Sequence, residues 1–343
     1  MIDALHSSRT EVVEERPPYA FVCVDRSLLV RPFCRYVVQP FAQWVPAGVP
    51  ANYITLISSA CMWLMLALVV GRPTAALAPW CLALMCGYVI YDHADGMHAR
   101  RTGTSGPLGE YLDHFLDVFH AAIAVIAAAA VSGLAGSPWL PLVLWAVLLG
   151  SAATMVEQLE RRELFFGVLG PLEGMLVMMA FFAAWCPAGA AEWWSMPVWG
   201  LTRLELAFAI GGAGGLVTAI ACVRRIGRVP WSLATYAVAS GGLIWALVGS
   251  EVGSTGTMLL VMLHGSDYVG RVIGCHLRGG SRPWPDLVAP TAAAFVSLSG
   301  VGSEWLGMAL ALYLAVRNVG AIARTVHALR RGWRWWNPPA VAA

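Results

Sequence analysis

Long apolar stretches separated by short polar segments dominate the chain from residue 52 onwards. A helix needs roughly 20 residues to cross the hydrocarbon core of a bilayer, and many of these stretches come close to that length. They lie near residues 52–70, 75–97, 112–134, 138–157, 168–186, 203–223, 231–250, 255–274, 286–301 and 304–323. The pattern therefore predicts an all-α polytopic membrane protein with about ten transmembrane helices.

Arginine positions predict how these helices are oriented, because the cytoplasmic loops of membrane proteins are enriched in basic residues. The arginines gather in every second loop and near the end of the chain, while the loops between hold few of them. The clusters are Arg100–Arg101, Arg161–Arg162, Arg224–Arg225–Arg228, Arg278–Arg282 and Arg324–Arg330–Arg331–Arg334. This alternation predicts an even number of spans, with the N- and C-termini both in the cytoplasm.

The segment before the first span mixes charged and apolar residues. Residues 24–48 combine arginines with Leu, Phe, Tyr and Trp, a pattern typical of an amphipathic helix in the membrane interface. A helix packed on a cytosolic surface is the alternative. Residues 1–23 carry charges without the apolar core and cleavage site of a secretory signal, so we expect a flexible cytoplasmic N-terminus.

Composition supports a membrane location and narrows the partners. Apolar residues make up 58% of the 343 residues, charged residues only 12%, and the mean hydropathy is +0.66. One soluble core could not bury so much apolar surface. The net charge is only +2, which gives no indication of a nucleic-acid partner. The absence of lysine and the abundance of alanine and arginine suggest a GC-rich bacterium, and hence its inner membrane.

Candidate chemistry is concentrated between residues 92 and 117. Asp92 and Asp95 lie near the end of one span, and Asp113 and Asp117 lie on the next. Both spacings place the carboxylates on one helix face, so an antiparallel turn would bring the two pairs together. Ionised groups near membrane depth are costly and indicate function. Clustered carboxylates select Mg²⁺ or Mn²⁺, and two such ions suit phosphoryl transfer.

The segment DHADGMHARRTGTSGPLGEYLDHFLD resembles the signature of the CDP-alcohol phosphotransferase family, DxxDGxxAR followed after eight residues by GxxxDxxxD. The matching positions are Asp92, Asp95, Gly96, Ala99, Arg100, Gly109, Asp113 and Asp117. The resemblance implies that the aspartates hold two metal ions and that the other four residues seat the CDP group. Asn52 lies in a segment similar to the family's PNxIT motif and is a further candidate contact for the nucleotide phosphates.

Neighbouring residues resemble the choline/ethanolamine phosphotransferase branch of that family. The chain has an ARRT segment at 99–102, a PLGE segment at 107–110, and His114 directly after the third aspartate. The resemblance implies transfer of phosphocholine or phosphoethanolamine from a CDP-alcohol to diacylglycerol, with release of CMP. We expect His114 to be the general base and Glu110, on the same helix face, to orient it. Phe115 stands where the branch has glycine, so the head group is left open.

Other functions remain open from the residues alone. CDP-diacylglycerol could be the donor to a small alcohol, because the signature serves both pairings. A transporter or an inactive membrane scaffold is an alternative of a different class. Against it, no signature ligand is missing, and the spans show no duplicated half with broken helices. The expected partners are the CDP-alcohol, diacylglycerol or another lipid acceptor, membrane lipids and a second copy of the chain in a homodimer.

The resemblance also divides the chain into functional parts. Residues 49–225 are expected to form the catalytic helices and residues 226–325 additional spans for lipid access or dimerisation. Residues 326–343 are expected to form a cytoplasmic tail. The glycine-rich residues 211–215 predict close packing of two helices rather than a nucleotide site.

Several polar residues outside the signature also lie in or beside predicted spans. We expect these residues to line a lipid-access cavity: Glu157, Glu173, His264, Asp267 and Arg271. For Asp267 and Arg271, four positions apart, an i to i+4 pair on one helix is the alternative. Structural or interfacial roles are expected for His93, His98 and His120.

Overall fold

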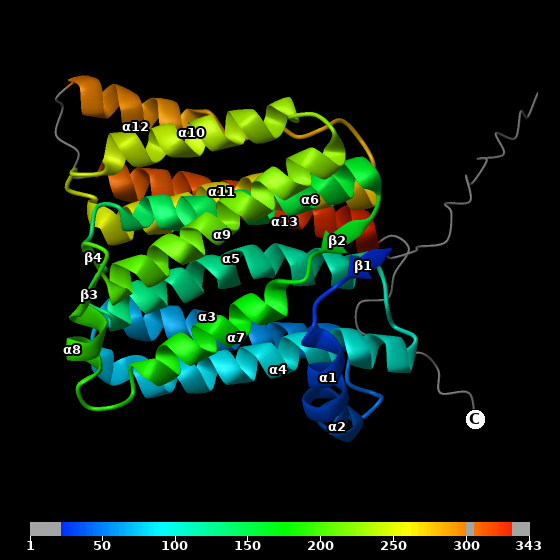
Figure 1. Cartoon of the computed structure of the whole chain (residues 1–343). Helices are drawn as coiled ribbons and strands as arrows, with labels where there is room; N and C mark the ends of the chain where they lie inside the picture. Colours follow the sequence, from blue (N-terminus) through cyan, green and yellow to red (C-terminus); the bar gives the residue numbers. More distant parts are fainter. Residues whose placement is uncertain (1–21, 300–304, 331–343) are drawn as a thin grey trace, which may run out of the picture.

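Within the described residues, every predicted span forms a helix, and these helices lie side by side in one bundle (Figure 1). The computed structural model describes residues 22–299 and 305–330. The bundle consists of α3 (Ala51–Gly71), α4 (Ala78–Thr102), α5 (Pro107–Val131), α6 (Leu140–Arg161), α7 (Pro171–Ala184), α9 (Arg203–Ile226), α10 (Trp231–Leu247), α11 (Gly253–Arg278), α12 (Val288–Ser299) and α13 (Leu306–Arg330).

Length and composition identify which of these helices could cross a bilayer. In the part of the chain that the structure describes, six helical stretches are long and apolar enough. They are Ala51–Gly71, Ala75–Thr102, Pro107–Val131, Leu140–Arg161, Arg203–Ile226 and Leu306–Leu329. The protein is therefore a multi-pass membrane protein whose bundle also contains several shorter helices.

Short elements connect the long helices at one end. α8 (Ala190–Ser195) and the antiparallel strands β3 (Pro197–Val198) and β4 (Leu201–Thr202) lie between α7 and α9. A 3₁₀ turn, η2 (Ala75–Leu77), precedes α4. The hydroxyl of Thr202 accepts a hydrogen bond from the backbone N–H of Glu205, which caps the first turn of α9.

The prediction for residues 24–48 is partly wrong. Residues Cys23–Asp25 form strand β1, which pairs in parallel with β2 (Leu164–Phe166). Helix begins only at α1 (Val30–Phe33) and continues through a π-helical segment, η1 (Cys34–Val38), into α2 (Gln39–Trp44). The apolar pattern could not reveal the strand because its partner is distant in sequence. The helical part has the predicted amphipathic character, since Val38 is buried whereas Trp44 is 86% exposed.

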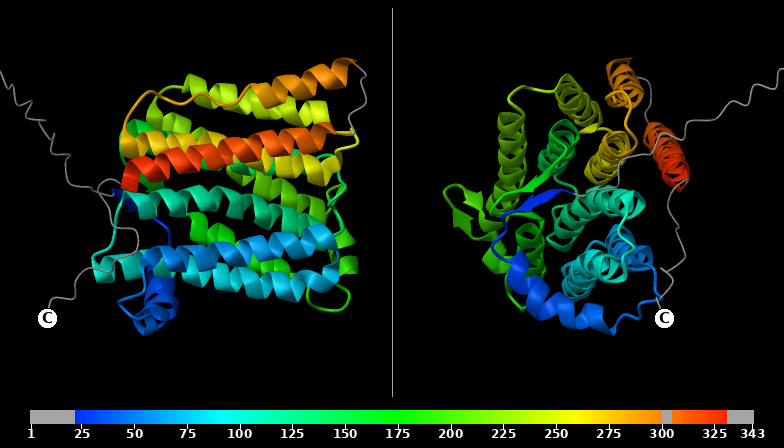
Figure 2. Two further views of the ribbon diagram at one scale, coloured as in Figure 1. Left: turned by 180° about the vertical axis from the view of Figure 1, so that it is seen from behind. Right: turned by 90° about the vertical axis from the view of Figure 1, so that its right-hand side faces the viewer.

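α5 is the most enclosed of the long apolar helices. It packs against α3, α6 and α11, and the end-on view shows it near the middle of the bundle (Figure 2). Tyr111 and Phe115 of α5 stack with a ring separation of 5.5 Å. A Cβ atom on Gly270 of α11 would lie only 2.6 Å from the Phe115 ring, so glycine is needed where these two helices touch.

The expected close packing of residues 211–215 is confirmed at the contact between α6 and α9. A Cβ atom on Gly215 would lie 2.3 Å from the carbonyl oxygen of Ala146, and one on Gly150 would lie 2.8 Å from the Gly215 carbonyl oxygen. Real side chains do not fit at such distances. The glycines therefore allow the two backbones to approach directly.

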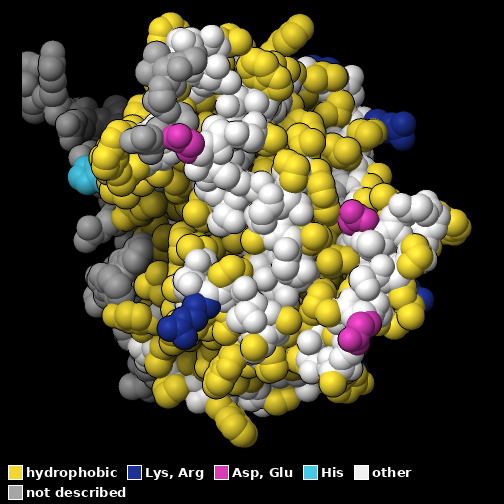
Figure 3. All heavy atoms as spheres, turned by 90° about the vertical axis from the view of Figure 1, so that its left-hand side faces the viewer, with side chains coloured by type: hydrophobic (Ala, Val, Ile, Leu, Met, Phe, Trp, Pro, Cys, Tyr) yellow, Lys and Arg dark blue, Asp and Glu magenta, His cyan; other side chains and the backbone are white. Residues whose placement is uncertain are grey.

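The arginine clusters of α6, α9 and α11 meet at one end of the bundle. The carboxylate of Glu160 accepts hydrogen bonds from Arg228 and Arg282, each at 2.8 Å. Arg162 donates to the carbonyl of His276 at 3.0 Å. The surface of the opposite end is mostly apolar and uncharged, with isolated charged side chains (Figure 3). This asymmetry agrees with the alternation of arginine-rich loops along the sequence.

Predictions for the two termini fall largely outside the described residues. The structure does not describe residues 1–21 or 331–343, so the cytoplasmic position of both ends stays a prediction. The expected cytoplasmic tail at residues 326–343 also stays a prediction, and α13 continues to Arg330 within it.

The buried glutamates outside the signature have structural partners. Arg225 donates two hydrogen bonds to the carboxylate of Glu157, at 2.6 and 2.7 Å. The Glu173 carboxylate accepts from the backbone N–H groups of Leu29 and Gly170, at 3.1 and 2.8 Å, which holds α7 against the segment before α1. A lipid-access cavity is therefore not needed to explain why these two carboxylates are buried.

The predicted pair of Asp267 and Arg271 is confirmed and belongs to a larger network. Arg271 donates to the Asp267 carboxylate within α11, and Arg317 of α13 donates to it at 3.2 Å. Arg317 also lies 3.6 Å from Asp286, whose backbone carbonyl lies 2.9 Å from the His264 ring nitrogen Nε2. This network connects α11, α13 and the segment before α12.

Candidate active site

The helical hairpin of α4 and α5 carries all four candidate aspartates. α4 ends at Thr102 and is capped by Gly103, whose φ of 66° lies in the left-handed region that favours glycine. α5 begins at Pro107, where the first helical position needs no backbone N–H. The short turn returns the chain in the opposite direction, so the last part of α4 lies level with the first part of α5. α3 packs against both helices.

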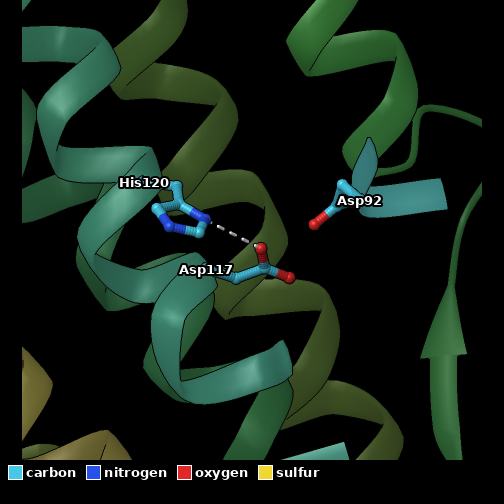
Figure 4. A group of neighbouring side chains, drawn as sticks. All are labelled: Asp92, Asp117 and His120. Carbon is cyan, nitrogen blue, oxygen red and sulfur yellow. Dashed lines mark hydrogen bonds and ion pairs between the residues drawn. The ribbon is translucent and has the colours of Figure 1, made fainter. Parts of the chain in front are cut away.

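Asp92 of α4, Asp117 of α5 and His120 of α5 form the tightest group of candidate ligands (Figure 4). One ligand atom from each residue lies within 4.8 Å of those from the other two. The Nδ1 atom of His120 is 3.4 Å from an Asp117 oxygen, and the hydroxyl of Tyr88 donates to the same oxygen at 3.0 Å. The hairpin thus brings one predicted aspartate from each helix together.

The other two predicted aspartates flank this group. Asp95 is buried and accepts a hydrogen bond from the hydroxyl of Thr55 on α3. Asp113 is 34% exposed and lies 3.9 Å from the Nε2 atom of His114. Asp113 is close enough to Asp95 and Asp117 to be repelled by both. The four carboxylates therefore share one region, although Asp95 and Asp113 are not within the tight group.

The residues predicted to seat the nucleotide include two neighbouring pairs, Asn52 with Gly109 and Arg100 with Gly96. Asn52 lies in the first turn of α3 and faces α5, where a Cβ atom on Gly109 would lie 3.4 Å from its Oδ1 atom. Arg100 folds back along α4, so that a Cβ atom on Gly96 would lie 3.3 Å from its Nη1 atom. Ala99 is partly buried on the same helix. The small residues thus leave room for polar side chains beside the aspartates.

Glu110 and His114 occupy the first turns of α5. Gln158 of α6 donates to the Glu110 carboxylate at 2.8 Å, and the Nε2 atom of His276 on α11 lies 4.0 Å from the same oxygen. The Nε2 atom of His114 faces Asp113, so its Nδ1 atom lies on the side of the ring away from that carboxylate. Glu110 therefore joins α5 to two later helices, which sequence spacing alone could not show.

The sequence prediction overlooked several residues that contact the aspartates. Thr55 and Ser59 follow Asn52 at helical spacing on α3, and Ser59 lies 2.9 Å from the Nε2 atom of His120. His120 itself was assigned a structural role, but it belongs to the tight ligand group. Its position three residues after Asp117 is a signal that could have included it.

The other two histidines fit the structural roles predicted for them. The Nε2 atom of His98 lies 2.7 Å from the carbonyl oxygen of Val49, and its Nδ1 atom lies 3.0 Å from Arg101. The Nδ1 atom of His93 lies 3.0 Å from the carbonyl oxygen of Val89 in the preceding turn. Both rings therefore have backbone partners.

Residues 49–204 match the family model described as CDP-alcohol phosphatidyltransferase. The match covers just under half of the 343 residues, and over this range the chain is similar to that family. The matched range contains the hairpin of α4 and α5 together with α3 and α6, so it includes the whole aspartate cluster. The protein is therefore an enzyme of phospholipid synthesis, and the aspartate cluster is its candidate active site.

Several curated relatives are similar to this chain. It is 24% identical to "Choline/ethanolaminephosphotransferase 1" of Saccharomyces cerevisiae, over 88% of this chain and 90% of the relative. It is 28% identical to "Cholinephosphotransferase 1" of Mus musculus, over 58% of this chain and 52% of the relative. It is also 30% identical to "CDP-diacylglycerol--serine O-phosphatidyltransferase" of Encephalitozoon cuniculi, over 47% of this chain and 44% of the relative.

These relatives come from eukaryotes, so the comparisons do not support the bacterial inner membrane that composition suggested. The integral, multi-pass membrane location of the enzyme is supported by its long apolar helices. Alanine and arginine content reflects coding preferences, which do not identify a membrane by themselves.

The donor set of the active site fits a divalent metal ion. Asp92 and Asp117 offer carboxylate oxygens, the ligands that Mg²⁺ and Mn²⁺ prefer. His120 is held between Asp117 and Ser59, so it could either bind an ion or orient the Asp117 carboxylate. The Asp and His group could therefore hold a metal ion.

Proposed function

We propose that the enzyme transfers phosphocholine or phosphoethanolamine from a CDP-alcohol to diacylglycerol and releases CMP. The observation that carries the proposal is the similarity to the choline/ethanolaminephosphotransferase of Saccharomyces cerevisiae along 88% of this chain. That similarity extends well beyond residue 204, where the match to the general family model ends. It therefore includes later helices that the shared signature does not explain.

In this proposal, ten helices span the membrane and the interfacial stretch of α1 to α2 precedes them. Residues 49–225 are the catalytic helices, and residues 226–325 provide lipid access or homodimer contacts. Exposed Leu28, Tyr36 and Trp44 beside α1 to α2 support an interfacial position for that stretch. The arginine-rich end of the bundle faces the cytoplasm, and the active site opens toward the same side.

The proposed cofactor is a pair of Mg²⁺ or Mn²⁺ ions held by Asp92, Asp95, Asp113 and Asp117. Bound there, the ions would neutralise charge that develops on the pyrophosphate during the transfer. The support is that carboxylates from two helices face one another without an arginine in an ion pair, in the part of the chain that the structure describes.

The chain's own residues would position the substrates and move one proton. Asn52, Gly96, Ala99, Arg100 and Gly109 seat the CDP group, because small residues admit it and Arg100 supplies a forked cation for its phosphates. His114 accepts the proton of the diacylglycerol hydroxyl. The freed oxygen forms a bond to the β-phosphorus, and the bond from that phosphorus to the bridging oxygen of CMP breaks.

Glu110 would orient the His114 ring in this scheme. It lies four residues before His114 on the same helix face, and its carboxylate is fixed by Gln158. His276 also lies beside Glu110, so Glu110 could orient this second imidazole instead of His114. Comparison of the two histidine variants distinguishes these roles.

A second reaction is supported by one relative. The protein similar over 47% of this chain is named a CDP-diacylglycerol–serine phosphatidyltransferase, so CDP-diacylglycerol could instead be the donor to a small alcohol. Both reactions release CMP and use the same signature.

Labelled CMP release by the purified protein in detergent tests the proposal. One set of reactions contains diacylglycerol with CDP-choline or CDP-ethanolamine, and the other contains CDP-diacylglycerol with serine or another small alcohol. Turnover only in the first set, lost on addition of chelator, is expected. Turnover only in the second set would assign the enzyme to the other reaction, and no turnover in either would contradict both.

A further inference from the structure

A cavity of about 320 Å³ lies between α11 and α13 and the loop after α11. Its lining includes three arginines together with small and polar residues, and no Asp or Glu is among the described residues that line it. The residues that matter for the argument are Arg271, Cys275, Arg278, Ser281, Arg324 and Thr325. The cavity thus has a strongly cationic wall.

Two of the three arginines have no acidic partner among the residues that the structure describes. Arg271 donates to the carboxylate of Asp267 within α11. By contrast, Arg278 and Arg324 form no ion pair within residues 22–299 and 305–330, and the Nε atom of Arg278 donates to a carbonyl of its own helix at 3.1 Å. Two guanidinium groups that line one cavity without a described counter-ion favour an anion in that cavity.

The loop after α11 supplies further polar groups to the cavity. Gly279 and Gly280 have φ values of 75° and 117°, a conformation that L side chains rarely adopt. This turn places Ser281 at the cavity wall. The thiol of Cys275 donates to the carbonyls of Gly280 and Ser281, at 3.5 and 3.3 Å, which holds the turn against α11.

α5 separates this cavity from the aspartate cluster. Tyr111 and Phe115 lie on the face of α5 that contacts Gly270 of α11. Asp113 and Asp117 each follow one of these residues by two positions, which turns them about 200° around the helix. On α11, His276 faces Glu110. Arg278 follows His276 by two positions, so it too is turned about 200° around its helix, away from Glu110. The cationic wall and the carboxylates therefore face opposite sides of α5.

We infer that this cavity binds the phosphate group of an anionic ligand at a second site, separate from the candidate active site. A phosphate group suits forked guanidinium donors, and a cavity of about 320 Å³ holds a phosphorylated head group. The phosphate comes either from an anionic membrane lipid or from a soluble phosphorylated molecule. The inference does not depend on which reaction the aspartates catalyse.

Binding to the full chain in a neutral detergent tests the inference. The probes are short-chain phosphatidic acid, inorganic phosphate and short-chain phosphatidylcholine, each titrated with chelator present so that no metal bridges phosphate to the aspartates. Isothermal titration calorimetry gives the Kd, and thermal unfolding of the same samples shows whether binding stabilises the fold. We expect phosphatidic acid to bind more tightly than phosphatidylcholine. Binding of inorganic phosphate as well would identify the phosphate alone as the ligand group, whereas binding of the lipid alone would identify a lipid head group.

Substitutions locate the binding site. Arg278→Gln with Arg324→Gln should weaken binding of the anionic probe by about 100-fold, since each lost charged contact is worth roughly tenfold. Arg224→Gln removes an exposed arginine of α9 that lines no part of this cavity and should change Kd less than twofold. If the double variant does not fold, Arg324→Gln should lose about tenfold and Arg324→Lys should lose less. Failure of all anionic probes to bind, or equal binding by the Arg324 and Arg224 variants, would overturn the inference.

Discussion

Carboxylates in two regions of this protein have opposite surroundings. Asp267 in α11 accepts hydrogen bonds from Arg271 and Arg317, so two cations neutralise one buried charge. In α4 and α5, Asp92 and Asp117 face one another and His120, and no aspartate of the cluster pairs with an arginine among the described residues. The charge of Asp267 is balanced by side chains of the same protein. The aspartates of the cluster instead repel one another, and a bound cation would relieve that repulsion.

This difference separates structural from functional acidic groups. Removal of a carboxylate from water is costly unless a partner compensates for it. At Asp267 the folded chain provides the partners. At the aspartate cluster the chain provides hydrogen bonds from Tyr88 and Thr55 but also places like charges together. Such an arrangement is expected where a metal ion contributes the missing charge.

The largest expected effect is loss of activity when one member of the cluster is neutralised. Asp117→Asn should lower CMP release by at least about 10³-fold, because an expected metal ligand loses its charge while its shape is kept. Thermal unfolding with chelator should be unchanged or shifted upward, since repulsion by Asp92 and Asp113 is reduced. If the Asp117→Asn enzyme were active, or strongly destabilised without metal, the aspartate cluster would not differ from Asp267 in having a functional rather than a structural role.

His114→Ala should lower CMP release by about 10² to 10⁴-fold if its imidazole is the general base. His276→Ala is the matched control, because this second histidine also lies beside Glu110 but comes from α11. Its loss should lower the rate by less than about tenfold. Reversed sizes of the two effects would assign proton transfer to His276, and metal dependence should be unchanged in both variants.

Neutralisation of Asp267 should lower the free energy of unfolding without changing the rate of CMP release per folded molecule. Asp267→Asn leaves Arg271 and Arg317 without their shared charge, and we expect a loss of about 2 kcal/mol in the free energy of unfolding. The side chains of the two arginines are 24% and 31% exposed, so water compensates for part of the loss. Activity per folded molecule should be retained, and Arg271→Gln in the same chain should recover part of the stability.

A second neutralised pair, Glu157 with Arg225, joins α6 to α9. Substitution of a glycine where these two helices touch tests whether their close approach stabilises the fold. Gly215→Ala should cost about 1–3 kcal/mol in the free energy of unfolding, because its Cβ atom would overlap Ala146. Gly214→Ala should be neutral or slightly stabilising, since no atom lies within 4 Å of its Cβ position. Equal unfolding temperatures for the two variants would show that the close approach is not required.

The smallest expected effect concerns a hydrogen bond to the aspartate cluster. Thr55→Val keeps the side-chain shape but removes the hydroxyl that donates to Asp95, and CMP release should fall by about tenfold. Ser58→Ala is the neighbouring control, because its hydroxyl donates to the backbone carbonyl of Tyr88 rather than to an aspartate. A rate for Thr55→Val equal to that of the control would show that Asp95 needs no partner from α3.

The amino-acid pattern by itself determined the number and order of the bundle helices and the position of the aspartates. Apolar runs of near-spanning length must form helices, since a bilayer leaves backbone groups no other partners. Fixed spacing within α4 and α5 then places Asp92 with Asp95 and Asp113 with Asp117 on common faces. These features depend only on interactions that are local in sequence.

The tertiary structure decided which residues meet across the bundle. Strand β1 pairs with β2, which follows α6 in the sequence. Thr55 and Ser59 of α3 contact members of the aspartate cluster. His276 of α11 lies beside Glu110. The tertiary structure also decided that Asp267 is neutralised by Arg317 from α13. No spacing rule reports such contacts, because they arise from how helices pack against one another, and packing depends on shape along the whole length of each helix.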